Sequence, residues 1–180
     1  MVLEKIMNDK IFVLGLDGAT WKIINEGINQ GLLPNFTEIK NSGITSDLKS
    51  TIPPFTLPAW TSMITGVNPG KHGIFDFFDV NGCILNSKKR AVPTIFQILS
   101  NNNITSISIN IPGTYPPDKI KGCVIADTLT TPSSEKNFVM PYNLKKYIIP
   151  YFKDSFDFEF TLASFLMYKN QNKLIDLANN

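Results

Sequence analysis

The sequence has little of several features that mark particular classes of protein. Lys and Arg number 17 against 15 Asp and Glu, so the formal net charge is only +2, and Arg90 is the single arginine. So small an excess leaves no basic face, and we expect no nucleic-acid partner. The two cysteines, Cys83 and Cys123, have no CxxC spacing, which fits neither a zinc ribbon nor a disulfide framework.

Long hydrophobic runs are also missing. The apolar run near the start covers only Ile11 to Leu16, too short for a membrane-spanning helix or for the apolar region of a signal peptide. We therefore expect a cytoplasmic protein with no membrane partner. Hydrophobic residues make up 43% and charged residues 18%, which excludes a disordered chain. The 180 residues contain no repeat or linker, and they predict a single domain over residues 1–180.

Strand and helix patterns alternate along the chain. The run from Ile11 to Leu16 is apolar apart from one glycine, which predicts a strand buried on both faces. Further strands are expected at residues 44–50, 104–109 and 123–126. Helices are expected at residues 21–30, 34–42, 58–65, 94–100, 141–149 and 162–177, with irregular structure or a hairpin over 67–92. This alternation predicts an α/β fold with a mostly parallel central sheet and flanking helices.

Two residues stand where such a fold places its chemistry. Asp17 follows the first predicted strand at its carboxyl end, where open α/β sheets bind ligands. Thr56 closes a proline-stiffened loop at or just before a helix start, where backbone N–H groups favour an anion. A threonine hydroxyl becomes a nucleophile when a divalent metal lowers its pKa, and an aspartate is a hard ligand for that metal. The alternative for each residue alone is a helix cap.

Three segments together resemble a known family. They are Phe12-Val-Leu-Gly-Leu-Asp17-Gly18, Thr56-Leu-Pro58-Ala-Trp60-Thr-Ser-Met-Ile-Thr65-Gly66 and Pro69-Gly-Lys-His72-Gly73-Ile74-Phe-Asp76-Phe. Their order is similar to that of the type I phosphodiesterase/nucleotide pyrophosphatase family of the alkaline phosphatase superfamily. Two later segments, from Val92 to Leu99 and from Asn110 to Pro117, resemble its branch of predicted phosphohydrolases or phosphomutases. The resemblance runs from about residue 10 to at least residue 143.

The resemblance implies a partial alkaline-phosphatase-like α/β sandwich whose complete site holds two divalent metals, usually zinc, with manganese or magnesium as alternatives. By position, Asp17 is similar to the first metal ligand, and Thr56 is similar to the nucleophile, which also binds metal and forms a phosphoryl-enzyme. The implied activity is a metal-dependent phosphohydrolase or phosphodiesterase acting on a phosphate ester or nucleotide.

Two further motif residues have supporting roles by the same resemblance. His72 matches a histidine that is not a metal ligand in the family, and we expect it to be structural. Trp60 marks a departure, because nucleotide pyrophosphatases carry Asn and His where this chain has Ala59 and Trp60. Specificity for nucleotides is therefore not implied. A sulfatase would need arginine at Trp60.

This chain has fewer candidate metal ligands than the family's site uses, which leaves alternative functions open. Family members draw two more Asp and three His from the second half of a longer chain, whereas this chain has one histidine. We therefore expect that this chain alone does not complete the two-metal site. Five aspartates remain as possible carboxylate ligands, but each is expected to be solvated or to act as a cap: Asp76, Asp79, Asp127, Asp154 and Asp157. The alternatives to an enzyme are a non-catalytic truncated remnant or binding module, or one half of a split enzyme. A half-built sheet also predicts self-association, or a second chain that supplies the rest.

Overall fold

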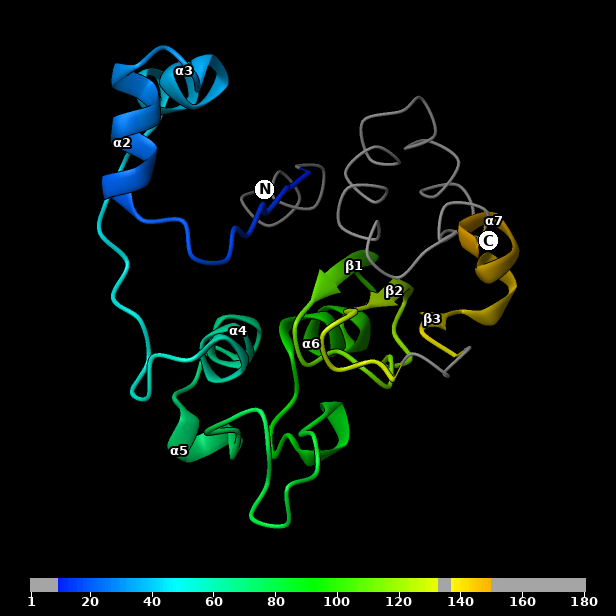
Figure 1. The fold of residues 1–180 in the computed structure, drawn as a ribbon. Helices are drawn as coiled ribbons and strands as arrows, with labels where there is room; N and C mark the ends of the chain where they lie inside the picture. The colour runs from blue at the N-terminus through cyan, green and yellow to red at the C-terminus, as the bar shows by residue number, and fades with distance from the viewer. Residues whose placement is uncertain (1–9, 133–136, 150–180) are drawn as a thin grey trace. The chain divides into compact units, whose positions relative to one another are not determined.

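The computed structural model describes residues 10–132 and 137–149 (Figure 1). Backbone contacts divide the chain into two compact units, Met1–Lys49 and Ser50–Asn180, and each is described by itself. The helix predicted at residues 162–177 lies outside the described residues. The single domain over residues 1–180 stays a prediction.

The described part of the first unit is built from two short helices, α2 (Trp21–Asn29) and α3 (Pro34–Ser42), which pack on one another. A Cβ atom on Gly27 would lie 2.6 Å from Cδ1 of Leu33, so the absence of a side chain there permits the close approach. Pro34 occupies the first turn of α3, where its missing N–H costs nothing. Both predicted helices are confirmed.

Two predicted strands in this unit are wrong. Residues 11–16 and 44–50 form no strand, and the apolar side chains of the first run are exposed. The physical reason is the lack of a ladder partner, because the described part of this unit contains helices only. In the second segment, the Ser46 carbonyl accepts a hydrogen bond from Trp21 Nε1 at 3.0 Å instead of from a neighbouring strand.

The other helices that the structure describes lie in the second unit, and α4 is the longest of these. It spans Thr56–Thr65 and ends at Gly66, whose φ of 70° is the left-handed conformation that closes many helices. The predicted helix at 58–65 is therefore confirmed and begins two residues earlier. The others are α5 (Pro69–His72), the 3₁₀ turn η1 (Ser87–Lys89), α6 (Ile95–Asn101), the 3₁₀ turn η2 (Tyr142–Leu144) and α7 (Lys145–Ile148).

Helix α6 begins with a complete capping box. The Thr94 hydroxyl accepts from Gln97 N–H, and the Gln97 side chain accepts from Thr94 N–H at 2.8 Å. The helix predicted at 141–149 divides into η2 and α7, so it is confirmed as helical but not as one continuous α-helix.

The described sheet has three strands in the order β1-β2-β3 (Figure 1). Strand β1 (Ser106–Ile111) pairs in parallel with β2 (Gly122–Ala126), and β2 pairs in antiparallel with β3 (Val139–Met140). The strands predicted at 104–109 and 123–126 are confirmed. This is the mixed α/β class that the sequence predicts.

Two apolar clusters form the core of the second unit over its described residues. One covers a face of the sheet and contains Cys123, Ile125, Val139, Leu144 and Ile148. The other joins α4 to the irregular segment after α5 and contains Leu57, Ile74 and Leu85. The second cluster holds the first turn of α4 in place. Within the described residues, no helix has the length and apolar character that crossing a membrane requires.

Candidate functional site

Thr56 is the first residue of α4. The residue before it, Phe55, is the extended N-cap, with φ −100° and ψ 156°, and its side chain makes no capping hydrogen bond. Thr56 is therefore not the N-cap that the alternative interpretation expected. The half-buried Thr56 side chain stands on the first helical turn, at the end of α4 where the helix dipole favours negative charge. Trp60 lies one turn later and is also half-buried.

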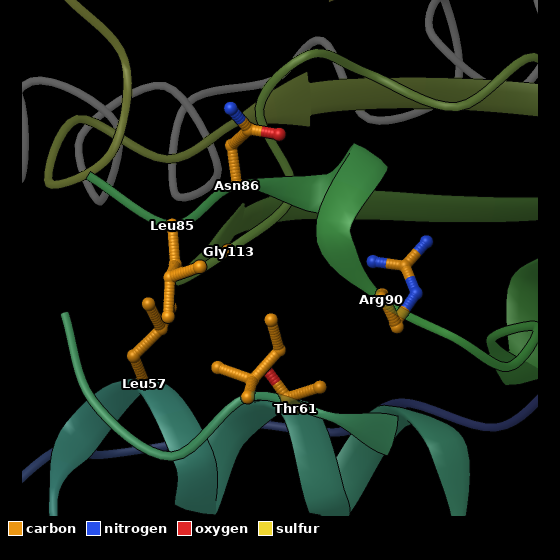
Figure 2. A pocket seen from close by; sticks show the side chains of 7 residues that line it. Leu57, Thr61, Leu85, Asn86, Arg90 and Gly113 are labelled. Carbon is orange, nitrogen blue, oxygen red and sulfur yellow. The ribbon is translucent and has the colours of Figure 1, made fainter. Parts of the chain in front are cut away.

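A small hollow lies beside the first two turns of α4. Figure 2 shows Leu57 and Thr61 on the helix side, with Asn86, Arg90 and Gly113 from the loops that face it. The hollow is a shallow depression with no space for a water-sized molecule. Gly113 has φ +81°, and a Cβ atom there would lie 2.8 Å from Leu57 Cδ1. The loop after β1 therefore packs directly on the residue that follows Thr56.

His72 is completely buried, with no exposed surface. Its Nδ1 accepts from Ile74 N–H at 3.1 Å, and its Nε2 lies 2.8 Å from Ser62 Oγ on α4. Burial is the main cause that lowers the pKa of His72, and the Arg90 guanidinium lowers it further, while the Pro58 carbonyl acts to raise it. Both ring nitrogens therefore have partners inside the protein, and the structural role of His72 stays a prediction. Sequence reasoning missed the partner Ser62, because no motif spacing marks it.

Arg90 ties together the loops next to the hollow. Its Nη2 lies 2.6 Å from Asp118 Oδ2, its Nε donates to the Val92 carbonyl at 3.3 Å, and its side chain is 4% exposed. A buried guanidinium needs such partners, since desolvating an unpaired charge costs several kcal/mol. The pairing makes Arg90 a structural cation beside α4.

Asp127 follows β2 directly and is 1% exposed. Its carboxylate accepts from Thr130 N–H at 2.6 Å, from the Thr130 hydroxyl at 2.7 Å and from Thr114 N–H at 3.1 Å. Asn110, at the end of β1, accepts from Thr128 N–H at 3.2 Å. These bonds join the loops at the carboxyl ends of both parallel strands, so Asp127 caps these loops, as expected.

The other candidate carboxylates are placed differently. Asp17 lies in a turn of the first unit and is exposed, and the N-cap of the helix that follows is Thr20, so Asp17 does not cap α2. Asp79 closes a turn by accepting from Asn81 N–H at 2.9 Å and Cys83 N–H at 3.0 Å. Asp76 is exposed, and Asp154 and Asp157 lie outside the described residues.

The donor chemistry fits a metal site only in part. Asp17 and Thr56 offer oxygen atoms, which suit hard divalent cations. Residues 10–132 and 137–149 contain no group of three His, Cys, Asp or Glu side chains that could hold a metal ion. The only histidine of the chain uses both ring nitrogens inside the protein. Asp17 belongs to the first unit and Thr56 to the second, so the metal site with both residues that the resemblance implies stays a prediction.

One comparison with known proteins gives a match. The sequence model of the family described as Type I phosphodiesterase / nucleotide pyrophosphatase matches residues 11–176. No curated protein and no solved structure matches.

Proposed function

Because the chain belongs to the type I phosphodiesterase/nucleotide pyrophosphatase family, we propose that it hydrolyses phosphoric esters with Thr56 as the nucleophile. The family match supports a phosphodiesterase or pyrophosphatase type of function, and the α/β elements agree with a partial alkaline-phosphatase-like fold. The observation that supports Thr56 is its place as the first residue of α4, where the helix dipole stabilises developing negative charge. The proposed substrate is a phosphate ester or nucleotide of small size.

The proposed reaction has two displacements at phosphorus. Thr56 Oγ1 attacks in line, the bond from phosphorus to the leaving oxygen breaks, and the leaving oxygen takes up a proton. The hydroxyl proton of Thr56 passes to solvent. Water then attacks the phosphorus of the phosphothreonine, the bond from phosphorus to Thr56 Oγ1 breaks, and Oγ1 takes up a proton from the attacking water, whose oxygen stays on phosphorus.

Asp17 and Thr56 are the residues of this chain that would hold a divalent metal, two zinc ions in the proposed complete site, or manganese or magnesium. A metal bound there lowers the pKa of the threonine hydroxyl and offsets charge on the phosphoryl oxygens. The described residues contain no group of three His, Cys, Asp or Glu side chains that could hold a metal ion, so the proposal takes the further ligands from elsewhere. Asp17 must also approach Thr56, which is part of the proposal.

The test is hydrolysis of bis-p-nitrophenyl phosphate and p-nitrophenyl phosphate with zinc, manganese or magnesium. Acid-quenched protein is examined by mass spectrometry for phosphate or its ester on Thr56. Thr56→Ala should abolish both turnover and label, and Thr56→Ser should keep part of each. Thr65→Ala is the matched control, because the Thr65 hydroxyl on the same helix only donates to the Thr61 carbonyl, at 2.7 Å.

A non-catalytic binding module is the second candidate. The observation that favours it is the engagement of the sole imidazole, His72, in the interior of the protein. Neither turnover nor label with any of the three metals would favour this module and overturn the hydrolase. Equal turnover in Thr56→Ala and the unchanged protein would also reject Thr56 as the nucleophile.

Self-association, or a second chain that supplies the missing ligands, is the proposed partner. Exposed apolar side chains before Asp17 support it, with Ile11 84% and Phe12 79% exposed. Light scattering after size exclusion, with and without zinc, should show a species heavier than one chain. A monomer under both conditions would contradict self-association.

A further inference from the structure

The imidazole of His72 connects three parts of the second unit. It stands at the end of α5, and its Nδ1 accepts from Ile74 N–H at 3.1 Å. Because Nδ1 accepts, the neutral ring carries its proton on Nε2. That atom lies 2.8 Å from Ser62 Oγ, and the Pro58 carbonyl also bonds to the ring. The proton on Nε2 therefore serves the contacts with α4.

We propose that His72 is a positioning residue, whose neutral imidazole ties the first two turns of α4 to the backbone after α5 and so fixes the direction of the Thr56 hydroxyl. This inference rests on the proposed role of Thr56. It goes beyond a structural role for a buried side chain, because it requires the tautomer of His72 with the proton on Nε2.

The contacts fall where they control the start of the helix. Pro58 and Ser62 are four residues apart, so they lie on one face of α4 in successive turns, two and six residues after Thr56. The backbone of His72 is held as well, since its carbonyl accepts from Ala91 N–H at 3.0 Å. A side chain with no exposed surface, held from both sides, restrains the helix that it contacts.

Protonation would remove this restraint. A second proton goes to Nδ1, where it faces the Ile74 N–H, so two donors meet and their hydrogen bond is lost. The charged group that acts on the ring is Arg90, which is paired with Asp118. Helix α4 carries no ionisable side chain between Thr56 and Thr65.

Two further charged side chains stand near His72 in the sequence. Lys71 precedes it on α5 and Asp76 follows it, and both are exposed. Neither Lys71 nor Asp76 is among the causes of the lowered pKa of His72. Burial and Arg90 therefore lower the pKa of His72 below its ordinary value.

Because the chain has a single histidine, nitrogen-15 NMR reads this imidazole without assignment variants. In the full 180-residue chain at neutral pH we expect the tautomer with the proton on Nε2. On acidification, the ring nitrogens and the backbone amides of α4 should change with one common midpoint below 6.5, the ordinary value for histidine. A proton on Nδ1, or a titrating ring with unchanged α4 amides, would overturn the proposal.

Variants add a second readout that does not depend on hydrolysis. Ser62→Ala should speed amide hydrogen exchange in α4 relative to α6 by roughly 5-fold, the effect of about one net hydrogen bond. Thr65→Val removes the hydrogen bond from the Thr65 hydroxyl to the Thr61 carbonyl and leaves His72 untouched, so α4 of this variant should keep the pH midpoint of the unchanged protein. His72→Gln, which can still donate to Ser62, should keep more of the protection than His72→Leu.

Equal exchange in His72→Gln and His72→Leu would reject the positioning role. These results separate the two proposals, because the tautomer and the exchange rates are measured whether or not Thr56 is phosphorylated. If Thr56 is not labelled but the contacts of His72 with α4 are intact, only the proposed function is overturned. If Thr56 is labelled but His72 does not restrain α4, only the positioning role of His72 is overturned.

Discussion

Thr114 and Asp127 hold each other by two hydrogen bonds across the carboxyl end of the sheet. Thr114 N–H donates to Asp127 Oδ2 at 3.1 Å, and Asp127 N–H donates to Thr114 Oγ1 at 3.3 Å. The loop after β1, which packs on α4 at Leu57, is thereby fixed to the loop after β2. One buried carboxylate therefore organises the edge of the sheet beside the candidate site.

Replacing this carboxylate should destabilise the fold. Asp127→Ala leaves the N–H groups of Thr114 and Thr130 and the Thr130 hydroxyl without their acceptor, in a place where water is excluded. We expect the free energy of unfolding to fall by about 3 kcal/mol in urea titrations. Asp79→Ala is the matched control, because Asp79 also accepts two backbone N–H groups but in an exposed turn that water can reach. Equal losses in the two variants would show that burial of Asp127 contributes nothing.

The close approach of the loop to α4 gives a second prediction. Gly113→Ala places a Cβ atom 2.8 Å from Leu57 Cδ1 at a φ of +81°, whereas Gly82→Ala meets nothing within 4 Å at a φ of +75°. Both substitutions carry the strain of the left-handed conformation, about 1 kcal/mol. Only the first also displaces Leu57, which should cost about 1–2 kcal/mol more. Thermal unfolding of the two variants measures the difference, and similar melting temperatures would mean that Leu57 moves aside freely.

Local signals in the sequence are enough to predict the longer helices, but not α5, which lies in the segment 67–92 where the sequence predicts irregular structure or a hairpin. The prolines and glycines around α3 and α4 mark their ends, and Thr94 with Gln97 marks the start of α6. The strands 106–111 and 122–126 are apolar or alternating runs in the sequence, and they pair with each other in the structure. Residues 11–16 carry an equally strong strand signal and form none, because a strand also needs a neighbour to receive its hydrogen bonds.

For the candidate site too, the sequence predicts what depends on local signals and not what depends on how distant segments meet. The helix start at Thr56 follows from the proline loop before it, although the N-cap is one residue earlier than the alternative interpretation expected. The contact between His72 and Ser62 depends on how the turn at Gly66 aims α5 back at α4, and no spacing rule encodes that angle. The use of Asp127 as a cap likewise depends on which loops meet at the edge of the sheet.

The two cysteines should differ sharply in reactivity. Cys123 lies in β2 with no exposed surface, and burial raises the pKa of its thiol to about 12, whereas Cys83 is exposed. Because the thiolate is the reactive form, a disulfide reagent should modify Cys83 alone in the folded protein. Cys83→Ser should then remove all labelling until denaturant is added. Labelling of Cys123 in the folded variant would show that β2 opens to solvent.

The buried His72 should make stability depend on pH in one direction. Folding lowers its pKa below the ordinary value of 6.5, so the unfolded chain binds more protons on the acidic side of that value. The contribution of His72 is complete above pH 6.5, declines as the pH falls towards the folded pKa, and levels off below it. As the pH is lowered through this range, the urea midpoint of the unchanged protein should fall. Glutamine does not titrate, so the stability of His72→Gln lacks the contribution of His72. Subtracting the stability curve of this variant from that of the unchanged protein corrects for the carboxylates that titrate in both. Parallel curves would mean that His72 has the same pKa in the folded and unfolded chains, which its lack of exposed surface argues against.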